Sequence, residues 1–204
     1  MSETTAKAKR VRRDPEVTKA LILDATERLM LDEGYAAVTT RAVAKLAGLA
    51  PGLVHYYYPS TDDVLVAAYR RTTERNFESL TEVLKSADPL REFWRFQTDA
   101  PHMALAMEFM ALANHRKAIK AEIARYADYA RDLQTEALAP ALKQTPIDPE
   151  ICPPVCVTTL LVSVARTLVM EQQAGITRGH AETQALMRWL LDRMAPEAAS
   201  ATPA

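Results

Sequence analysis

Apolar residues recur with a helical period along most of the chain. Between residues 15 and 33 the apolar positions among charged neighbours predict an amphipathic helix: Ala20, Leu21, Ala25, Leu29 and Met30. Gly34 is expected to end this helix, since glycine readily takes the backbone conformation that follows a helix. The apolar face is expected to close a three-helix core against residues further along the chain: Val38, Val43, Leu46 and Val54.

Two shorter helical patterns follow, and a glycine separates them. The first covers residues 40–47, with Thr39 or Thr40 placed to cap its free N–H groups. The second begins at Pro51, a residue favoured at the first helical position. Gly48, between them, can take the positive φ of a sharp turn. This spacing is typical of a helix-turn-helix, whose second helix enters the DNA major groove, although an ordinary helical hairpin also has it.

An aromatic run, His55-Tyr56-Tyr57-Tyr58, belongs to the second of these patterns. Consecutive aromatic residues on a helix point in different directions, so at least one is expected to face solvent or a partner. Tyrosine hydroxyls can donate to phosphate. The residues expected to meet DNA are Thr39, Thr40, Arg41, Lys45, Pro51, Gly52, Leu53, His55, Tyr56 and Tyr57. Within this set the candidates for reading bases are Arg41, Gly52, Leu53 and His55.

Several motifs, in this order, resemble the N-terminal domain of TetR-type transcriptional repressors. They are Ile22-Leu23-Asp24-Ala25-Thr26-Glu27-Arg28-Leu29-Met30, Glu33-Gly34-Tyr35, Thr39-Thr40-Arg41, Ala47-Gly48-Leu49, and Gly52-Leu53-Val54-His55-Tyr56-Tyr57-Tyr58 followed by Ser60. The resemblance covers about residues 17–69 and implies a DNA-binding domain followed by a helical domain that varies widely within the family. This chain has Thr61 where the family commonly has a Lys that donates to phosphate.

The rest of the chain has helical patterns divided by breakers. Ser60 or Thr61 can cap a helix that runs to about Lys85 and connects the two expected domains. Further helices are predicted at about 89–98, 101–113, 116–139, 150–174 and 180–194, with proline and glycine separating them at Pro101, Pro140, Pro146 to Pro154 and Gly175 to Gly179. The predicted fold is all-α: a flexible basic arm (1–14), a helix-turn-helix domain (15–61), a ligand-binding and dimerisation domain (62–195) and a flexible tail (196–204).

Residues of the second domain suggest a ligand pocket. Methionines recur at helical spacing between residues 103 and 110; such a stripe usually fills a core, but flexible methionines also line pockets for apolar ligands. The candidate walls are Trp94, Met103, Met107, Phe109, Met110, Tyr126 and Tyr129. The candidate polar groups are His115, Thr159, Ser163 and Arg166. Arg166 either pairs with a carboxylate such as Glu108 or Glu171, or anchors an acidic ligand.

The helix expected over residues 155–170 is apolar on nearly all sides. It is too short for a membrane span, and Arg166 would be costly there. A helix of this kind must be covered all round, so one side is expected to pack within its domain and the other against a second copy. The last two helices are therefore predicted to form a homodimer through Leu161, Val164, Leu168, Leu186, Trp189, Leu190 and Met194.

Charge and cysteine content narrow the picture further. The net charge is −1, but the first 60 residues carry nine Lys or Arg and seven Asp or Glu, with the densest basic run between Lys7 and Arg13. Such an arm either stays solvated or reaches toward DNA. The two cysteines, Cys152 and Cys156, form no disulfide framework or metal-site spacing. No secretory signal is apparent, so a cytoplasmic location is expected.

These observations predict a homodimeric, ligand-responsive repressor of transcription. It would bind a palindromic double-stranded operator, release it on binding a small hydrophobic effector, and need no cofactor, metal or membrane. One alternative is a helical enzyme that acts on a small molecule. Against it, the sequence shows no group of acid–base or metal-binding residues that would form a catalytic site. The other is an architectural helical protein, which would not need the aromatic run beside Gly52.

Overall fold

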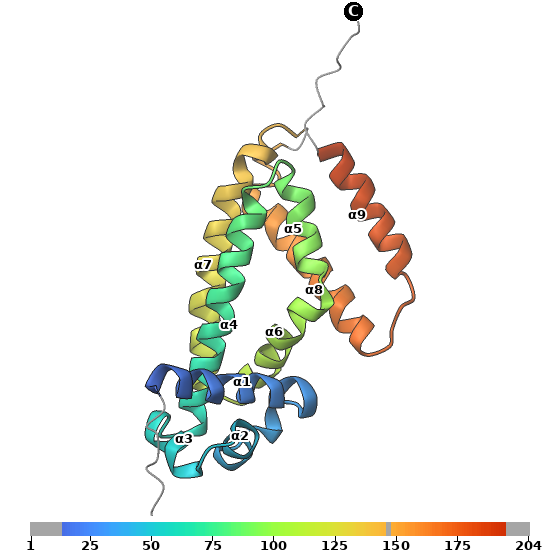
Figure 1. The fold of residues 1–204 in the computed structure, drawn as a ribbon. Helices are drawn as coiled ribbons and strands as arrows, with labels where there is room; N and C mark the ends of the chain where they lie inside the picture. Colours follow the sequence, from blue (N-terminus) through green and yellow to red (C-terminus); the bar gives the residue numbers. More distant parts are fainter. Residues whose placement is uncertain (1–13, 146–147, 195–204) are drawn as a thin grey trace, which may run out of the picture. The chain divides into compact units, whose positions relative to one another are not determined.

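The computed structural model describes residues 14–145 and 148–194. Within these ranges the chain forms nine α-helices and one short 3-10 helix, with no strand, so the all-α prediction is confirmed (Figure 1). The chain divides into two compact units, unit 1 up to Ala68 and unit 2 from Tyr69. The predicted tail and almost all of the predicted arm lie outside the described residues.

Unit 1 is built from three helices and the start of a fourth. Helix α1 (Pro15–Glu33) begins at the N-cap Asp14, whose carboxylate accepts from the Glu16 N–H, and ends at Gly34. The 3-10 helix η1 (Tyr35–Ala37) follows, and α2 (Thr40–Ala47) and α3 (Pro51–Tyr57) complete the predicted pair. The fully buried side chains at the centre are Ile22, Met30, Val43 and Val54.

The buried face of α1 differs in part from the predicted one. Ala20 is exposed and Leu21 is half-buried, whereas Ile22 and Leu23 are buried together with Ala25 and the rest of the face. Leu46 was expected in the core, but 41% of its surface is exposed. On α2 the buried pair is Val43 and Ala44; Leu46 lies one turn from Val43 but nearly opposite Ala44, so it is at the edge of the buried face.

Helix α4 (Thr61–Leu84) contains the division between the units. It starts with a reciprocal cap, in which the Asp63 N–H donates to Ser60 Oγ (3.1 Å) and the Ser60 N–H donates to Asp63 Oδ2 (2.9 Å). The division between the compact units falls after Ala68, so the buried Val64, Leu65 and Ala68 belong to unit 1, and a domain boundary at residue 61 stays a prediction.

Unit 2 holds the remainder of α4 and five further helices. These are α5 (Pro89–Thr98), α6 (Ala100–Ala113), α7 (Lys117–Leu142), α8 (Pro154–Gln173) and α9 (His180–Met194). Pro140 does not end α7, which continues to Leu142; near a helix end a proline disrupts few of the bonds that follow it. Helix α8 begins at Pro154 rather than near residue 150, with Pro153 as its N-cap.

Helix α8 packs against α5, α6 and α7 in unit 2. Its buried face joins the main core through Leu161, Ala165 and Leu168, which lie with Phe93 and Leu138. Of the helices in the described ranges, α8 is the one with the length and composition of a membrane span, but it serves here as a core helix. Leu161 and Leu168 are thus buried in their own chain, contrary to their predicted place in a dimer interface.

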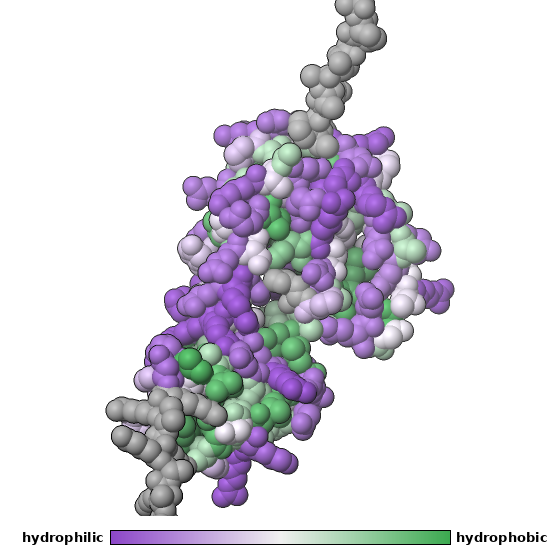
Figure 2. Space-filling view, viewed as in Figure 1, coloured by the Kyte–Doolittle hydropathy of each residue, from purple (hydrophilic) through white to green (hydrophobic). Residues whose placement is uncertain are grey.

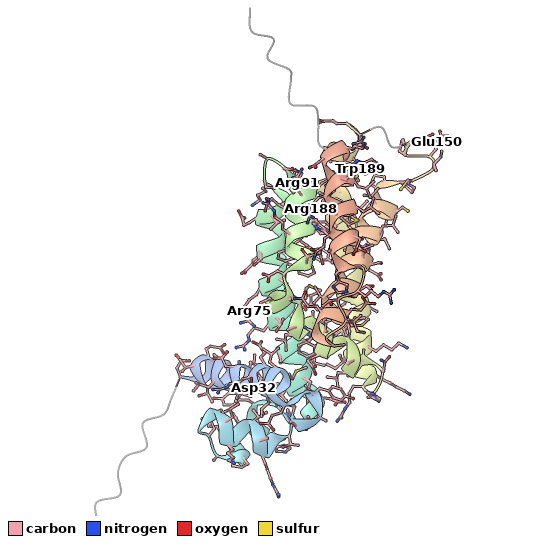
Figure 3. All side chains as sticks on the ribbon, turned by 90° about the vertical axis from the view of Figure 1, so that its right-hand side faces the viewer. Asp32, Arg75, Arg91, Glu150, Arg188 and Trp189 are labelled. Atoms are coloured by element: carbon pink, nitrogen blue, oxygen red, sulfur yellow. The ribbon has the colours of Figure 1, made fainter. Side chains whose placement is uncertain are left out.

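Helix α9 buries one side and exposes the other. Met187, Leu191 and Met194 are buried, so Met194 is also not available to a partner as predicted, whereas Leu186 and Trp189 are exposed. Arg91 of α5 pairs with the exposed Asp192 of α9 (2.6 Å) and with Asp88, the N-cap of its own helix (2.9 Å); Figure 3 labels Arg91 and Trp189.

Candidate functional site

The turn between α2 and α3 is defined by its hydrogen bonds. The Ala42 N–H donates to Thr39 Oγ1 (3.1 Å), so Thr39 is the N-cap of α2. Gly48 ends that helix in the left-handed region, with φ 64° and ψ 37°. The Leu49 N–H then donates to the Ala44 carbonyl (2.9 Å), which closes the turn, and Pro51 starts α3. A residue with a Cβ is strained at the Gly48 φ.

Buried residues on α2 and α3 decide which sides of the two helices remain outside. Val43 and Ala44 are fully buried, and Val54 nearly so. All ten residues predicted to meet DNA have exposed surface: Thr39, Arg41, Lys45, Pro51, Gly52, His55 and Tyr56 are exposed, and Thr40, Leu53 and Tyr57 are half-buried. Unit 1 therefore brings all ten onto the outer surface of one helix pair and its cap.

Tyr56 is the most exposed aromatic residue of this surface, with 77% of its area accessible. Its ring meets the Tyr57 ring edge-on, with centroids 5.2 Å apart. Gly52 has no heavy atom within 4 Å of the position that a Cβ would take, so the backbone there is open to close approach. Exposed rings, hydroxyls and two cations beside a bare backbone can contact phosphates and base edges.

Unit 2 contains a cavity of about 220 Å³ between the helices α4, α5, α6, α7 and α8. Its aromatic residues are Tyr69, Phe77, Phe96, Phe109 and Tyr126. Tyr69 contacts Phe109 and Tyr126 edge-on, with centroids 5.1 and 5.7 Å apart. Burial raises the pKa of Tyr69, which keeps its hydroxyl neutral at ordinary pH. Among the described lining residues there is no carboxylate, and the charged one is Arg166.

Five of the predicted ligand residues line this cavity: Met103, Phe109, Met110, Tyr126 and Arg166. The others do not. Trp94 is buried in the main core, and Tyr129 is largely exposed on the far side of Phe77, with centroids 5.0 Å apart. Thr159 is exposed and donates to the Val155 carbonyl. Met107 and His115 are outside the lining.

Ser163 lines a different hollow, of about 290 Å³, between α8 and the start of α9. This hollow is wide open to solvent. Its polar walls include Glu171 and His180, which bond to each other (2.9 Å). We favour the α4–α8 cavity as the ligand site because it is more enclosed and mostly apolar.

The predicted ligand residues include none from α4, although this helix lines the cavity. Six lining residues come from this helix: Tyr69, Thr72, Thr73, Asn76, Phe77 and Leu80. Their spacing of three and four residues was visible in the sequence as one helix face that mixes aromatic and small polar residues. The buried amides Gln97 and Gln134 were also missed.

An ion-pair cluster joins α4 to α7 beside the cavity. Arg70 makes two hydrogen bonds to Glu122 (2.7 and 3.1 Å), and Arg125 makes a third (2.8 Å). These bonds from Arg70 and Arg125 lower the pKa of Glu122 to about 2. In the described ranges no three His, Cys, Asp or Glu residues come together as metal ligands. Burial and a hydrogen bond with Cys156 raise the pKa of the Cys152 thiol, which makes it less reactive.

Known proteins match the two units differently. Residues 22–68 match the family described as bacterial regulatory proteins, tetR family. The chain is 34% identical over 79 residues to the HTH-type transcriptional regulator BetI of Rhizobium meliloti, covering 39% of this chain and 38% of that one. It is 48% identical over 54 residues to the HTH-type transcriptional repressor KstR of Rhodococcus jostii, covering 26% of each. The matched segment thus spans well under half of either relative.

Beyond that segment the likeness is one of fold. A transcriptional regulator of Saccharomonospora viridis, solved in complex with choline, is 20% identical, with a TM-score of 0.72 over 87% of this chain and 94% of that one. The same helical architecture therefore extends through unit 2. Since the sequence match and the helix-turn-helix geometry coincide in unit 1, this chain carries an N-terminal domain of the TetR type.

Proposed function

We propose that this protein is a ligand-responsive transcriptional repressor. As a homodimer it binds a palindromic operator, and a small hydrophobic effector held in unit 2 releases it. The main support for the proposal is the outer surface of α2 and α3. Arg41, Gly52 and Tyr56 are exposed on this surface, and the turn at Gly48 positions the short helix α3. DNA is cytoplasmic in bacteria, so the proposal includes a cytoplasmic location.

Each residue of the DNA surface has a proposed role. Thr40, Tyr56 and Tyr57 contact phosphate, whereas Arg41, Leu53 and His55 contact base edges. Gly52 lets the backbone of α3 approach the groove, since no side chain stands there. Phosphate contacts release counterions, so binding weakens steeply as salt is raised.

A dimer is proposed because one short recognition helix reads only a few base pairs. Two such helices, about 34–36 Å apart or somewhat more, meet successive turns of the groove. The proposed interface is the outer side of α8 and α9, where large apolar residues are exposed: Val155, Leu160, Met170, Leu186 and Trp189. In Figure 2 hydrophobic residues lie among hydrophilic ones in the part of unit 2 where α8 and α9 lie. Covering such residues favours association.

The proposed effector site is the cavity between α4 and α8. Its aromatic and methionine walls suit an apolar body, and its polar side chains suit a few directed hydrogen bonds. The similar regulator from Saccharomonospora viridis was solved with choline. Aromatic rings also suit such a cation, but the Arg166 guanidinium in the wall repels one, so we do not extend choline to this chain.

A gel shift with DNA from upstream of the protein's own gene tests the repressor. Salt-dependent binding of a fragment that carries an inverted repeat is expected. An enzyme or an architectural protein would show no preference between that fragment and a scrambled copy. If every fragment binds alike, or none binds, the proposal is wrong.

Light scattering at micromolar concentration tests the assembly. The expected mass is twice 22.6 kDa. Leu186→Glu on the exposed side of α9 is expected to give a monomer, whereas Gln184→Glu, at an exposed position of α9 that faces α5, is expected to leave the dimer. A monomer mass for the unaltered chain contradicts the proposal.

A further inference from the structure

Arg166 is a cation in the cavity wall without an acidic partner. Glu108 and Glu171 were the carboxylates predicted to pair with Arg166. Glu171 bonds to His180 instead. Among the described residues Arg166 has no ion pair with Glu108 or any other acid. Much of the Arg166 side chain is exposed, yet desolvation lowers the pKa of its guanidinium, and the positive charge of Arg131 lowers it further. The alternative of an internal pair for Arg166 is therefore excluded within the described chain.

Arg131, on α7, is the second cation of this region. Its Nη1 is buried and, among the described residues, has no hydrogen-bond partner. The acids nearest in sequence, Asp128 and Asp132, are exposed and make no ion pair with it there. The positive charge of Arg131 thus acts on the Arg166 guanidinium, and no carboxylate of the described chain forms an ion pair with either arginine. Partly desolvated charges of one sign are costly unless an opposite charge joins them.

The rest of the lining is of two kinds. Rings and methionines form an apolar wall, and the amides Gln97 and Gln134, both buried, offer donors without adding charge. The described part of the lining holds no acid that would attract a cation. A ligand with an apolar body and one negative end fits this lining. Its body can lie against the apolar wall, and its negative end can bind Arg166, because arginine binds a carboxylate through two parallel hydrogen bonds.

We propose that the effector is an organic carboxylate, whose apolar body lies against the ring wall and whose carboxylate is held by Arg166, with Arg131 adding positive potential. This inference rests on the proposed function, because it assigns a chemical class to the effector of the same cavity. A carboxylate bound in this way removes the repulsion between the two guanidinium groups. It therefore stabilises the bound arrangement of α7 and α8, from which the two cations come.

The test uses three probes that share one body and differ in the end group: 3-phenylpropanoate, 3-phenylpropanamide and 3-phenylpropylamine. Isothermal titration calorimetry on the full chain is expected to rank the carboxylate about tenfold or more above the amide, with the amine weakest, since hydrogen bonds to charged groups are the stronger ones. Equal affinities, a preference for the amine, or no binding of the carboxylate at millimolar concentration would overturn the proposal.

Variants locate the anion site. R166Q is expected to remove the advantage of the carboxylate over the amide, R166K to keep part of it, and R131Q to reduce it about threefold. R188Q, an exposed arginine on α9 (Figure 3), is the matched control and is expected to change neither affinity. If R166Q leaves the ratio unchanged but converts the dimer to a monomer, Arg166 serves the subunit interface and the proposal is wrong.

The gel shift separates this inference from the proposed function. Carboxylate binding with no effect on DNA affinity leaves the anion site standing and contradicts the effector response. Operator binding by a dimer that takes up no carboxylate leaves the repressor standing and contradicts the anion site.

Discussion

The two candidate sites of this protein are built in opposite ways. In unit 1 the core lies inside, and the residues proposed to act lie outside, on α2 and α3. In unit 2 the residues proposed to act face inward, around a cavity that the core leaves open beside α4 and α7. The matched family segment ends at residue 68, at the end of unit 1, and over most of unit 2 the likeness to known proteins is one of fold.

The two sites restrict the sequence to different degrees. The α2–α3 surface needs an exact turn, so it depends on few residues close together in sequence: the Thr39 cap, Gly48 and the buried Ala44. The cavity needs a volume and a few directed groups, which five helices supply. Many sets of side chains can leave a similar volume, so the sequence around it is free to differ between proteins of one fold.

The largest effect is expected from filling the cavity. Ala106 lines it on α6, so Ala106→Trp places a ring where the effector would lie. Loss of the response to effector is expected, with DNA affinity within about twofold of the original. The measurement is a gel shift titrated with effector. Ala111→Trp, on the exposed side of α6, is the matched control and should respond normally. A full response by Ala106→Trp would place the effector elsewhere.

The next largest effects, on stability and operator affinity, are expected at two glycines with different structural roles. Gly52 lies within α3 with open space around it, so Gly52→Ala should stabilise the fold by about 0.5–1 kcal/mol. The added methyl nevertheless holds the backbone off DNA, and operator affinity should fall about tenfold or more. Urea unfolding and gel shifts measure the two quantities. If affinity is kept, α3 does not approach the groove at Gly52.

Gly48→Ala is the contrasting variant. Gly48 has space around it too, but its φ of 64° lies in the left-handed region. Alanine there should destabilise unit 1 by about 1–2 kcal/mol, without adding a group to the proposed DNA surface. The remaining folded protein should therefore bind operator with little loss. Equal effects of Gly48→Ala and Gly52→Ala on affinity would contradict the separate roles.

How far the sequence predicts each site follows from the same contrast. Thr39, Gly48 and Pro51 act through local backbone geometry, so their roles follow from residue type and spacing alone, and the helices at 15–33 and 40–47 have the predicted bounds. Leu46 shows the limit even there. Its residue type fits a core, but only the packing of α2 decides which side is buried.

The cavity could be predicted only in part, because its members meet through tertiary packing. Met103 and Phe109 line it, while Met107, on the same predicted stripe, does not. Trp94 has the right chemistry but fills the main core. The contribution of Arg131 depends on the approach of α7 to α8, which no local pattern encodes.

A smaller effect is expected at the aromatic run. Tyr56→Phe removes a hydroxyl from the most exposed ring of unit 1 and should weaken binding to all DNA sequences alike, about two- to tenfold, the worth of one hydrogen bond. Arg41→Ala should instead change the preferred sequence. Binding to operator and to a scrambled duplex, measured at two salt concentrations, distinguishes them. A change of preference in Tyr56→Phe would assign Tyr56 to base reading.

The smallest expected effect tests the wall of the cavity between α4 and α7. Glu122 accepts from Arg70 and Arg125, and these bonds lower its pKa from 4.5 to about 2. A lowered pKa in the folded state means that the carboxylate stabilises the fold above pH 4.5, and that this contribution is lost as pH falls toward 2. Both arginines are about half exposed, so solvent screening keeps the effect modest.

Glu122→Gln should therefore lower Tm slightly at pH 7, and the difference from the original chain should shrink as pH falls below 4.5. Thermal unfolding followed by circular dichroism measures both. Glu82→Gln breaks the Lys85 pair on the exposed side of α4 and is the control, with no difference expected at any pH. Helix α4 contains the division between the units, and its bonds to α7 lie in unit 2. Loosening this wall should therefore reduce effector affinity more than DNA affinity. If Glu122→Gln changes neither Tm nor effector affinity, the cluster does not hold the cavity wall.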